Sequence, residues 1–115
     1  MRYILLIYGD EAGRGAMSED DRHAMYAEYE KFANEITERG IGRGGDELSP
    51  VSSATTVRER EGTMLVTDGP FAETKEQLGG YFIVEVDDLD TALELAKAMP
   101  GVHGGSIEIR PIVEG

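Results

Sequence analysis

The chain has 115 residues, 40% of them hydrophobic and 30% charged, which is typical of one folded domain (1–115) and excludes a disordered acidic tail. Its net charge of -12 argues against direct binding to nucleic acid or to an anionic lipid surface. Cysteine is absent, which excludes a disulfide framework, a thiolate metal site and a cysteine nucleophile.

The N-terminal segment 3–8 is apolar and is closed by Gly9-Asp10. The uninterrupted β-branched and aromatic residues predict a strand buried on both faces. The run is far shorter than the roughly 20 residues of a membrane-spanning helix. It also lacks the small-residue cleavage site of a signal peptide. We therefore expect a cytoplasmic protein without a membrane partner.

A glycine-rich loop is expected over 9–17, followed by a long helix over 18–39. Ser18 is a good N-cap, and Gly40 ends the helix as a left-handed C-terminal residue. Helical spacing of apolar residues predicts one buried stripe, formed by Met25, Tyr29, Phe32 and Ile36.

The middle of the chain predicts a hairpin. Segment 41–50 is a loop that could contain a short strand. Strands are expected over 54–60 and 63–67, and the two residues Glu61-Gly62 between them suit a tight turn. Asp68-Gly69-Pro70-Phe71 is a further turn.

The second half of the chain repeats the pattern of strand, helix and strand. A short helical turn is expected over 72–78 and a central strand over 81–86. Asp87 or Asp88 caps a second helix that ends before Pro100-Gly101. Its buried face is expected to hold Leu89, Ala92, Leu93 and Ala96. Segment 106–112 alternates and predicts a last strand, in which Pro111 favours an edge position or the end of the strand.

This order of elements predicts an α+β fold, a ferredoxin-like split βαβ sandwich with both helices on one face of the sheet. The other face would expose apolar side chains of the central strands. The simplest cover is a second copy, sheet against sheet, in a two-fold homodimer.

Two patterns are weak as functional signals. Segment 40–45 matches the spacing of a dinucleotide-binding glycine motif, but a helix precedes it and Asp46-Glu47 would repel phosphate, so it is rejected. His23 could be a general base paired with a carboxylate, or an exposed helix residue. His103 lies in a loop, and no helical histidine pair exists, so no metal and no cofactor are expected.

Asp68 is the candidate catalytic residue. It ends a strand beside a rigid Gly-Pro turn, where partial burial could tune the pKa of an acid/base group. The alternative is an Asx-turn, in which the carboxylate accepts hydrogen bonds from the amides around Gly69 and Phe71.

The candidate ligand-binding residues come from the loop after Asp68 and from strand ends. Phe71, Glu73 and Lys75 could line a cleft, or form a solvated turn whose Phe71 closes the edge of the core. Tyr8 and Arg110 could offer a hydroxyl and a guanidinium to an anionic ligand. Charge that protects an edge strand explains Arg110 equally well.

Segment 68–81, with the sequence DGPFAETKEQLGGY, resembles the signature of DGPF-domain proteins, a branch of the YCII-related family. Residues 1–8, 65–67, 86–90 and 107–111 are similar as well, so the resemblance covers essentially the whole chain. It implies a ferredoxin-like α+β fold in a homodimer of the dimeric α/β-barrel type.

On function the resemblance implies less, because the DGPF branch has no established reaction. Some members are linked to sigma-factor-dependent transcription. The wider family has a proposed His-Asp acid/base pair, with the histidine about three turns before the glycine that closes the first helix. Here Tyr29 stands at that place and His23 lies further upstream, so the resemblance assigns no catalytic histidine.

Two hypotheses follow. The favoured one is a dimeric module that binds a small ligand or a regulatory protein. The alternative is a small-molecule enzyme of lyase or isomerase type, with a pocket between the sheet and the first helix. In that enzyme Asp68 would carry the proton, and Tyr29 or Tyr8 would donate a hydrogen bond.

Overall fold

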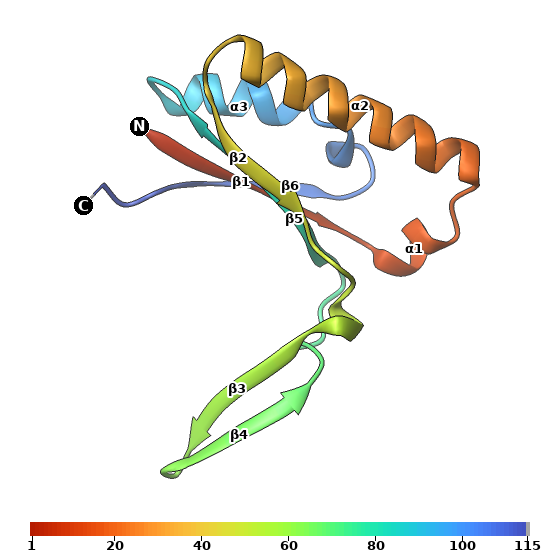
Figure 1. Cartoon of the computed structure of the whole chain (residues 1–115), viewed down its shortest axis with the longest axis vertical. Helices are drawn as coiled ribbons and strands as arrows, with labels where there is room; N and C mark the ends of the chain where they lie inside the picture. Colours follow the sequence, from red (N-terminus) through yellow and green to blue (C-terminus); the bar gives the residue numbers. More distant parts are fainter. Residues whose placement is uncertain (115) are drawn as a thin grey trace.

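Four antiparallel strands form the main sheet in the computed structural model, which describes residues 1–114 (Figure 1). Their order across the sheet is β2-β5-β1-β6. The strands are β1 (Arg2–Gly9), β2 (Gly42–Glu47), β5 (Gln77–Glu85) and β6 (Ser106–Pro111). The α+β class is confirmed, and this strand order is the one expected for a split βαβ arrangement.

The helices α2 (Glu19–Glu38) and α3 (Leu89–Lys97) pack on one face of this sheet. The core between the layers is formed by Tyr3, Leu5, Phe32, Ile36, Val84, Val86, Ala92, Leu95 and Met99. The opposite face carries Ile4 and Leu6, which stay only partly buried in the single chain. Ile4 is the register partner of Ile83, so these side chains share that open face.

The helix ends follow the local signals in the sequence. The Ser18 hydroxyl accepts a hydrogen bond from the Asp21 amide at 3.1 Å, and Gly40 after α2 has a φ of 71°. Asp88 caps α3. The expected buried face of α3 is wrong in part, because Leu95 is buried while Leu89 and Leu93 are exposed.

The expected loop 9–17 is wrong as well, because it contains a short helix, α1 (Glu11–Gly15). Distant parts of the chain hold this helix. The Glu11 carboxylate accepts from the Val51 amide at 3.1 Å, and the Glu11 amide donates to Gln77 Oε1 at 3.0 Å. Its sequence EAGRG has a low intrinsic helix propensity, so these tertiary contacts decide the conformation.

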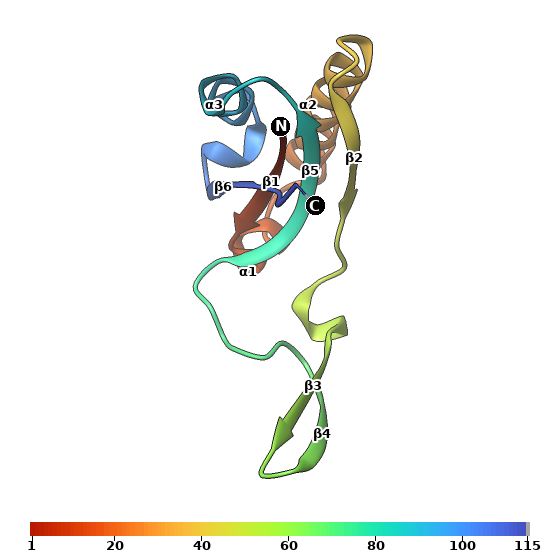
Figure 2. The ribbon, with the colours of Figure 1, turned by 90° about the vertical axis from the view of Figure 1, so that its left-hand side faces the viewer.

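The strands β3 (Thr55–Arg60) and β4 (Thr63–Asp68) form the expected hairpin. Glu61 and Gly62 have φ angles of 52° and 79°, as a tight primed turn requires. The hairpin is a separate two-stranded sheet and no part of the main one. It projects from one end of the main sheet in both views (Figures 1 and 2).

The remaining connections are short. Two 3₁₀ turns occur, η1 (Val51–Ser53) before β3 and η2 (Pro100–Val102) before β6. The helical turn expected over 72–78 is wrong, because bends continue to Glu76 and β5 begins at Gln77. Within residues 1–114, no helix is both long and apolar enough to cross a membrane.

Candidate functional site

A pocket of about 810 Å³ opens at the end of the main sheet, beneath the N-terminal half of α2. The ends of β1 and β2, the start of β5, helix α1 and the turn η2 complete its wall. Its apolar lining includes Ile7, Met17, Ala24, Met25, Tyr29 and Phe82. Its volume lies within the range of cofactor and small-molecule sites, so it is the first candidate for a functional site.

Glycines make up much of the pocket wall. Eight of them line it, namely Gly9, Gly13, Gly45, Gly79, Gly80, Gly101, Gly104 and Gly105. At Gly101 a Cβ atom would lie 2.5 Å from the Tyr29 hydroxyl, and at Gly79 it would lie 2.9 Å from Arg14 Nη2. The missing side chains therefore create space that Tyr29 and Arg14 occupy.

Tyr29 lies inside the pocket, as the sequence hypothesis of a site between sheet and helix requires. Its ring stacks on Phe82, with centroids 6.4 Å apart and planes 21° apart. Burial raises the pKa of the Tyr29 hydroxyl, while the Gly101 backbone and the charge of Arg14 act in the opposite direction. The hydroxyl is therefore neutral at physiological pH and can donate a hydrogen bond.

Arg14 is the cationic residue of the pocket lining. It extends from α1 and is partly buried. Among the residues that the structure describes, no carboxylate forms an ion pair with its guanidinium and no group accepts a hydrogen bond from it. The backbone carbonyl of Arg14 accepts from Arg22 Nη2 at 3.5 Å, which links α1 to α2.

Two tyrosine–carboxylate hydrogen bonds hold the edge strand β2, that of Tyr26 beside the pocket and that of Tyr81 on the open face of the sheet, where Tyr81 is the register partner of Leu6. Tyr81 donates to Asp46 at 2.8 Å, and Tyr26 donates to Glu47 at 3.2 Å. Each hydrogen bond raises the pKa of its tyrosine, because the hydroxyl must stay protonated to donate. These contacts join the edge strand β2 to β5 and to α2.

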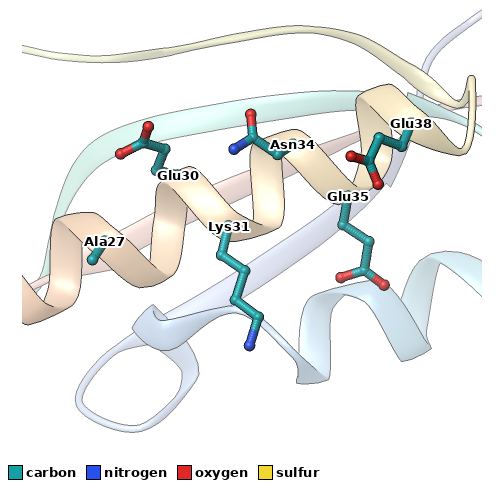
Figure 3. A pocket seen from close by; sticks show the side chains of 6 residues that line it. All are labelled: Ala27, Glu30, Lys31, Asn34, Glu35 and Glu38. Atoms are coloured by element: carbon teal, nitrogen blue, oxygen red, sulfur yellow. The ribbon is translucent and has the colours of Figure 1, made fainter.

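A second, shallower groove of about 450 Å³ lies on α2 itself. Figure 3 shows Glu30, Asn34 and Glu38 on one flank of the helix, and Lys31 and Glu35 on the flank toward α3. Ala27 is the sixth residue of the groove and its only apolar one, and all six positions are exposed. This groove is a solvated helix surface.

Tyr8 and Arg110 lie close together in the structure, and both contact the carboxylate of Glu108. Arg110 forms an ion pair with Glu108 at 3.1 Å, and the Tyr8 hydroxyl is 3.5 Å from the same carboxylate. Tyr8 also contributes to the pocket wall, whereas Arg110 does not. The guanidinium that faces the pocket is therefore that of Arg14.

The candidates of segment 68–75 lie on or beside the hairpin, outside the pocket lining. Asp68 is exposed at the end of β4, and Phe71, Glu73 and Lys75 are exposed as well. Phe71 is 75% exposed, so it closes no core edge, and its carbonyl accepts a hydrogen bond from Arg58. Among the described residues, the Asp68 carboxylate accepts no turn amide. Its catalytic role stays a prediction that no finding tests.

The histidines lie outside the pocket. His23 and His103 are both exposed, and neither contributes to the lining. In the described part of the chain, no three His, Asp or Glu side chains are placed to hold a metal ion.

Sequence reasoning missed Arg14, Met17 and the glycine wall. The available signal was the concentration of glycines in three separate segments, 9–15, 79–80 and 101–105. Each segment suits a turn by itself, so only their meeting at one pocket reveals that they accommodate side chains from elsewhere.

Comparison with known proteins gives two findings. The family model of the YCII-related domain matches residues 1–114. The chain is also 34% identical, over 114 residues, to an uncharacterised protein of Rhizobium meliloti (strain 1021). This alignment covers 97% of the chain and 92% of that relative.

Proposed function

The chain belongs to the YCII-related family, and we propose that it is a small-ligand-binding module that acts as a homodimer. The observation that carries the proposal is the pocket beneath α2, which combines an apolar lining with the guanidinium of Arg14. Apolar walls with a few convergent polar groups are characteristic of small-molecule sites.

The glycine wall supports a binding role over a purely structural one. A cavity that served only packing would be filled by side chains, because empty space costs stability. Here Gly9 and Gly79 give room to the guanidinium of Arg14, and Gly101 gives room to the Tyr29 hydroxyl beside Ile7 and Ile107. Such a wall keeps polar atoms accessible to a bound molecule.

The dimer is proposed from surfaces that the single chain leaves uncovered. On β3 and β4, Val57, Met64 and Val66 are 63%, 67% and 67% exposed. The partly exposed Ile4, Leu6 and Ile83 add an apolar region on the open face of the main sheet. Exposed apolar surface of this kind is typical of protein interfaces, and a second copy offers the same surfaces in return.

The proposal includes a regulatory role in sigma-factor-dependent transcription, and the family resemblance alone supports that role. The net charge of -12 favours contact through another protein over direct contact with nucleic acid.

The binding function is tested with a neutral probe, N-phenyl-1-naphthylamine, whose fluorescence rises in apolar sites. Ala24 lines the pocket, so Ala24→Trp is expected to block it and to abolish the fluorescence increase. Ala27 lies one turn further along α2, in the solvated groove (Figure 3), so Ala27→Trp serves as the matched control and should bind the probe normally.

Equal probe binding by both variants would place the probe elsewhere, for example on the exposed hairpin. Absence of probe binding by the wild-type protein would contradict the proposed function itself. Circular dichroism of all three proteins verifies that each one is folded.

A further inference from the structure

The guanidinium of Arg14 rests against glycine backbone at the pocket wall. A Cβ at Gly79 would lie 2.9 Å from Nη2 and 3.0 Å from Nη1, and a Cβ at Gly9 would lie 3.3 Å from Nη2. Two strand ends, those of β1 and β5, therefore shape the place where this cation sits. Its planar group has several N–H donors that no described residue engages, and such donors favour a bound oxyanion.

The charges around the pocket limit how much negative charge a ligand can carry. Five acidic residues contribute to its lining, Asp10, Asp21, Glu28, Asp46 and Glu47, and Arg14 is the basic one. The Asp46 side chain lies on the open face of the sheet, so four acidic side chains remain on the pocket side. Glu47 accepts the Tyr26 hydroxyl, and Asp10 accepts the Ala12 amide. One anionic group can pair with Arg14, whereas a second would meet net repulsion.

The apolar part of the pocket favours a flat ligand body. Tyr29 and Phe82 stack nearly parallel, and Met17 and Met25 line the same pocket. Methionine side chains adapt to ligand shape and make favourable contacts with aromatic rings. The raised pKa of Tyr29 keeps its hydroxyl available as a donor beside this surface.

We propose that the pocket binds a small monocarboxylate with a flat apolar body, whose carboxylate pairs with the guanidinium of Arg14. This inference rests on the proposed binding function and names its ligand class. The carboxylate would lie at the end of the pocket where the Arg14 guanidinium contacts Gly9 and Gly79.

The test compares three probes of one scaffold, 2-naphthoate, 2-naphthamide and 2-naphthyl phosphate, by isothermal titration and NMR on the wild-type protein. Naphthoate is expected to bind about tenfold more tightly than the isosteric neutral amide, because a charged hydrogen-bonded pair replaces a neutral one. The phosphate, which carries about two negative charges near neutral pH, is expected to bind more weakly than naphthoate.

Variants test whether Arg14 causes the preference for naphthoate over naphthamide. In Arg14→Met the acid and the amide should bind equally, while Arg14→Lys should keep part of the preference. Arg39→Met removes the same charge from an exposed position at the end of α2, and it should leave the preference unchanged.

The outcomes separate the inference from the proposed function. If N-phenyl-1-naphthylamine binds but naphthoate and naphthamide bind equally, or the phosphate binds most tightly, the ligand class is overturned and the binding function stands. If the preference for the acid persists in Arg14→Met, the role of Arg14 is overturned. If neither the fluorescent probe nor any naphthyl probe binds, both proposals fail.

Discussion

Arg14 and Gly79 illustrate at the residue scale how a missing side chain can shape a site. The three heavy atoms nearest to a Cβ at Gly79 all belong to the end of the Arg14 side chain. At Gly45, in contrast, the nearest atom is the carbonyl oxygen of Tyr81, at 2.6 Å. A flexible side chain can move away from an added methyl group, whereas a paired strand cannot.

Two glycine substitutions should therefore differ in what they damage. Gly79→Ala is expected to displace the guanidinium, which lowers naphthoate affinity about tenfold by loss of the charged pair and leaves the melting temperature nearly unchanged. Gly45→Ala is expected to destabilise the fold by about 1–3 kcal/mol, as overpacking does. Thermal unfolding and titration calorimetry on both variants check this, and a large stability loss in Gly79→Ala would contradict it.

At the scale of the secondary-structure elements, helix α3 depends on its N-terminal cap, Asp88. Asp88 Oδ1 accepts hydrogen bonds from the Thr91 amide at 2.9 Å and from the Thr91 hydroxyl at 2.7 Å. These bonds hold the pKa of Asp88 below its usual range, with the Thr91 hydroxyl as the larger cause. A lowered pKa in the folded state means that the ionised cap stabilises α3 at neutral pH, and that this contribution is lost as the pH falls through the lowered pKa.

Asp88→Asn keeps a capping oxygen but removes the titration. The wild-type protein should therefore be more stable than Asp88→Asn near neutral pH, and the difference should vanish in acid, below the ordinary pKa range of aspartate. Urea unfolding across this pH range measures it. Asp87→Asn is the control, because its carboxylate accepts no hydrogen bond among the described residues, and a pH-independent difference for Asp88→Asn would contradict the linkage.

At the scale of the whole molecule, the hairpin dominates the shape. The radius of gyration is 16.1 Å, against about 13 Å for a compact chain of this length. Val57 pairs with Val66, and Glu59 pairs with Met64, so Val57, Met64 and Val66 share one face of the hairpin, while the less exposed Leu65 lies on the other. An isolated two-stranded hairpin is marginally stable, and a partner surface would remedy that.

Dimerisation through this face is tested by Val66→Lys and by its neighbour Thr67→Lys, which points to the opposite face. The wild-type protein and Thr67→Lys should sediment as dimers at micromolar concentration, whereas Val66→Lys should sediment as a monomer. A dimer in all three proteins would assign the interface elsewhere. A wild-type monomer would contradict the homodimer itself.

Local sequence signals predicted much of the fold. The caps Ser18 and Asp88, the left-handed Gly40 and the turn Glu61-Gly62 act within a few residues, so the sequence alone placed both long helices and the hairpin. The apolar stripe also put Tyr29 on the inner side of α2, and the structure confirms this orientation. Family membership was likewise readable from the sequence.

Tertiary contacts decided the rest. Helix α1 depends on Glu11 meeting Val51 and Gln77, contacts that span 40 and 66 positions in the chain. Tertiary packing also places the Arg14 guanidinium beside Gly79. The hairpin forms a sheet of its own, and Asp68 is exposed to solvent. Spacing along the chain cannot encode which distant segments meet. The sequence by itself therefore determined the two longer helices, the hairpin and the family. Helix α1, the pocket and the cation in it arise only when distant segments meet in the folded chain.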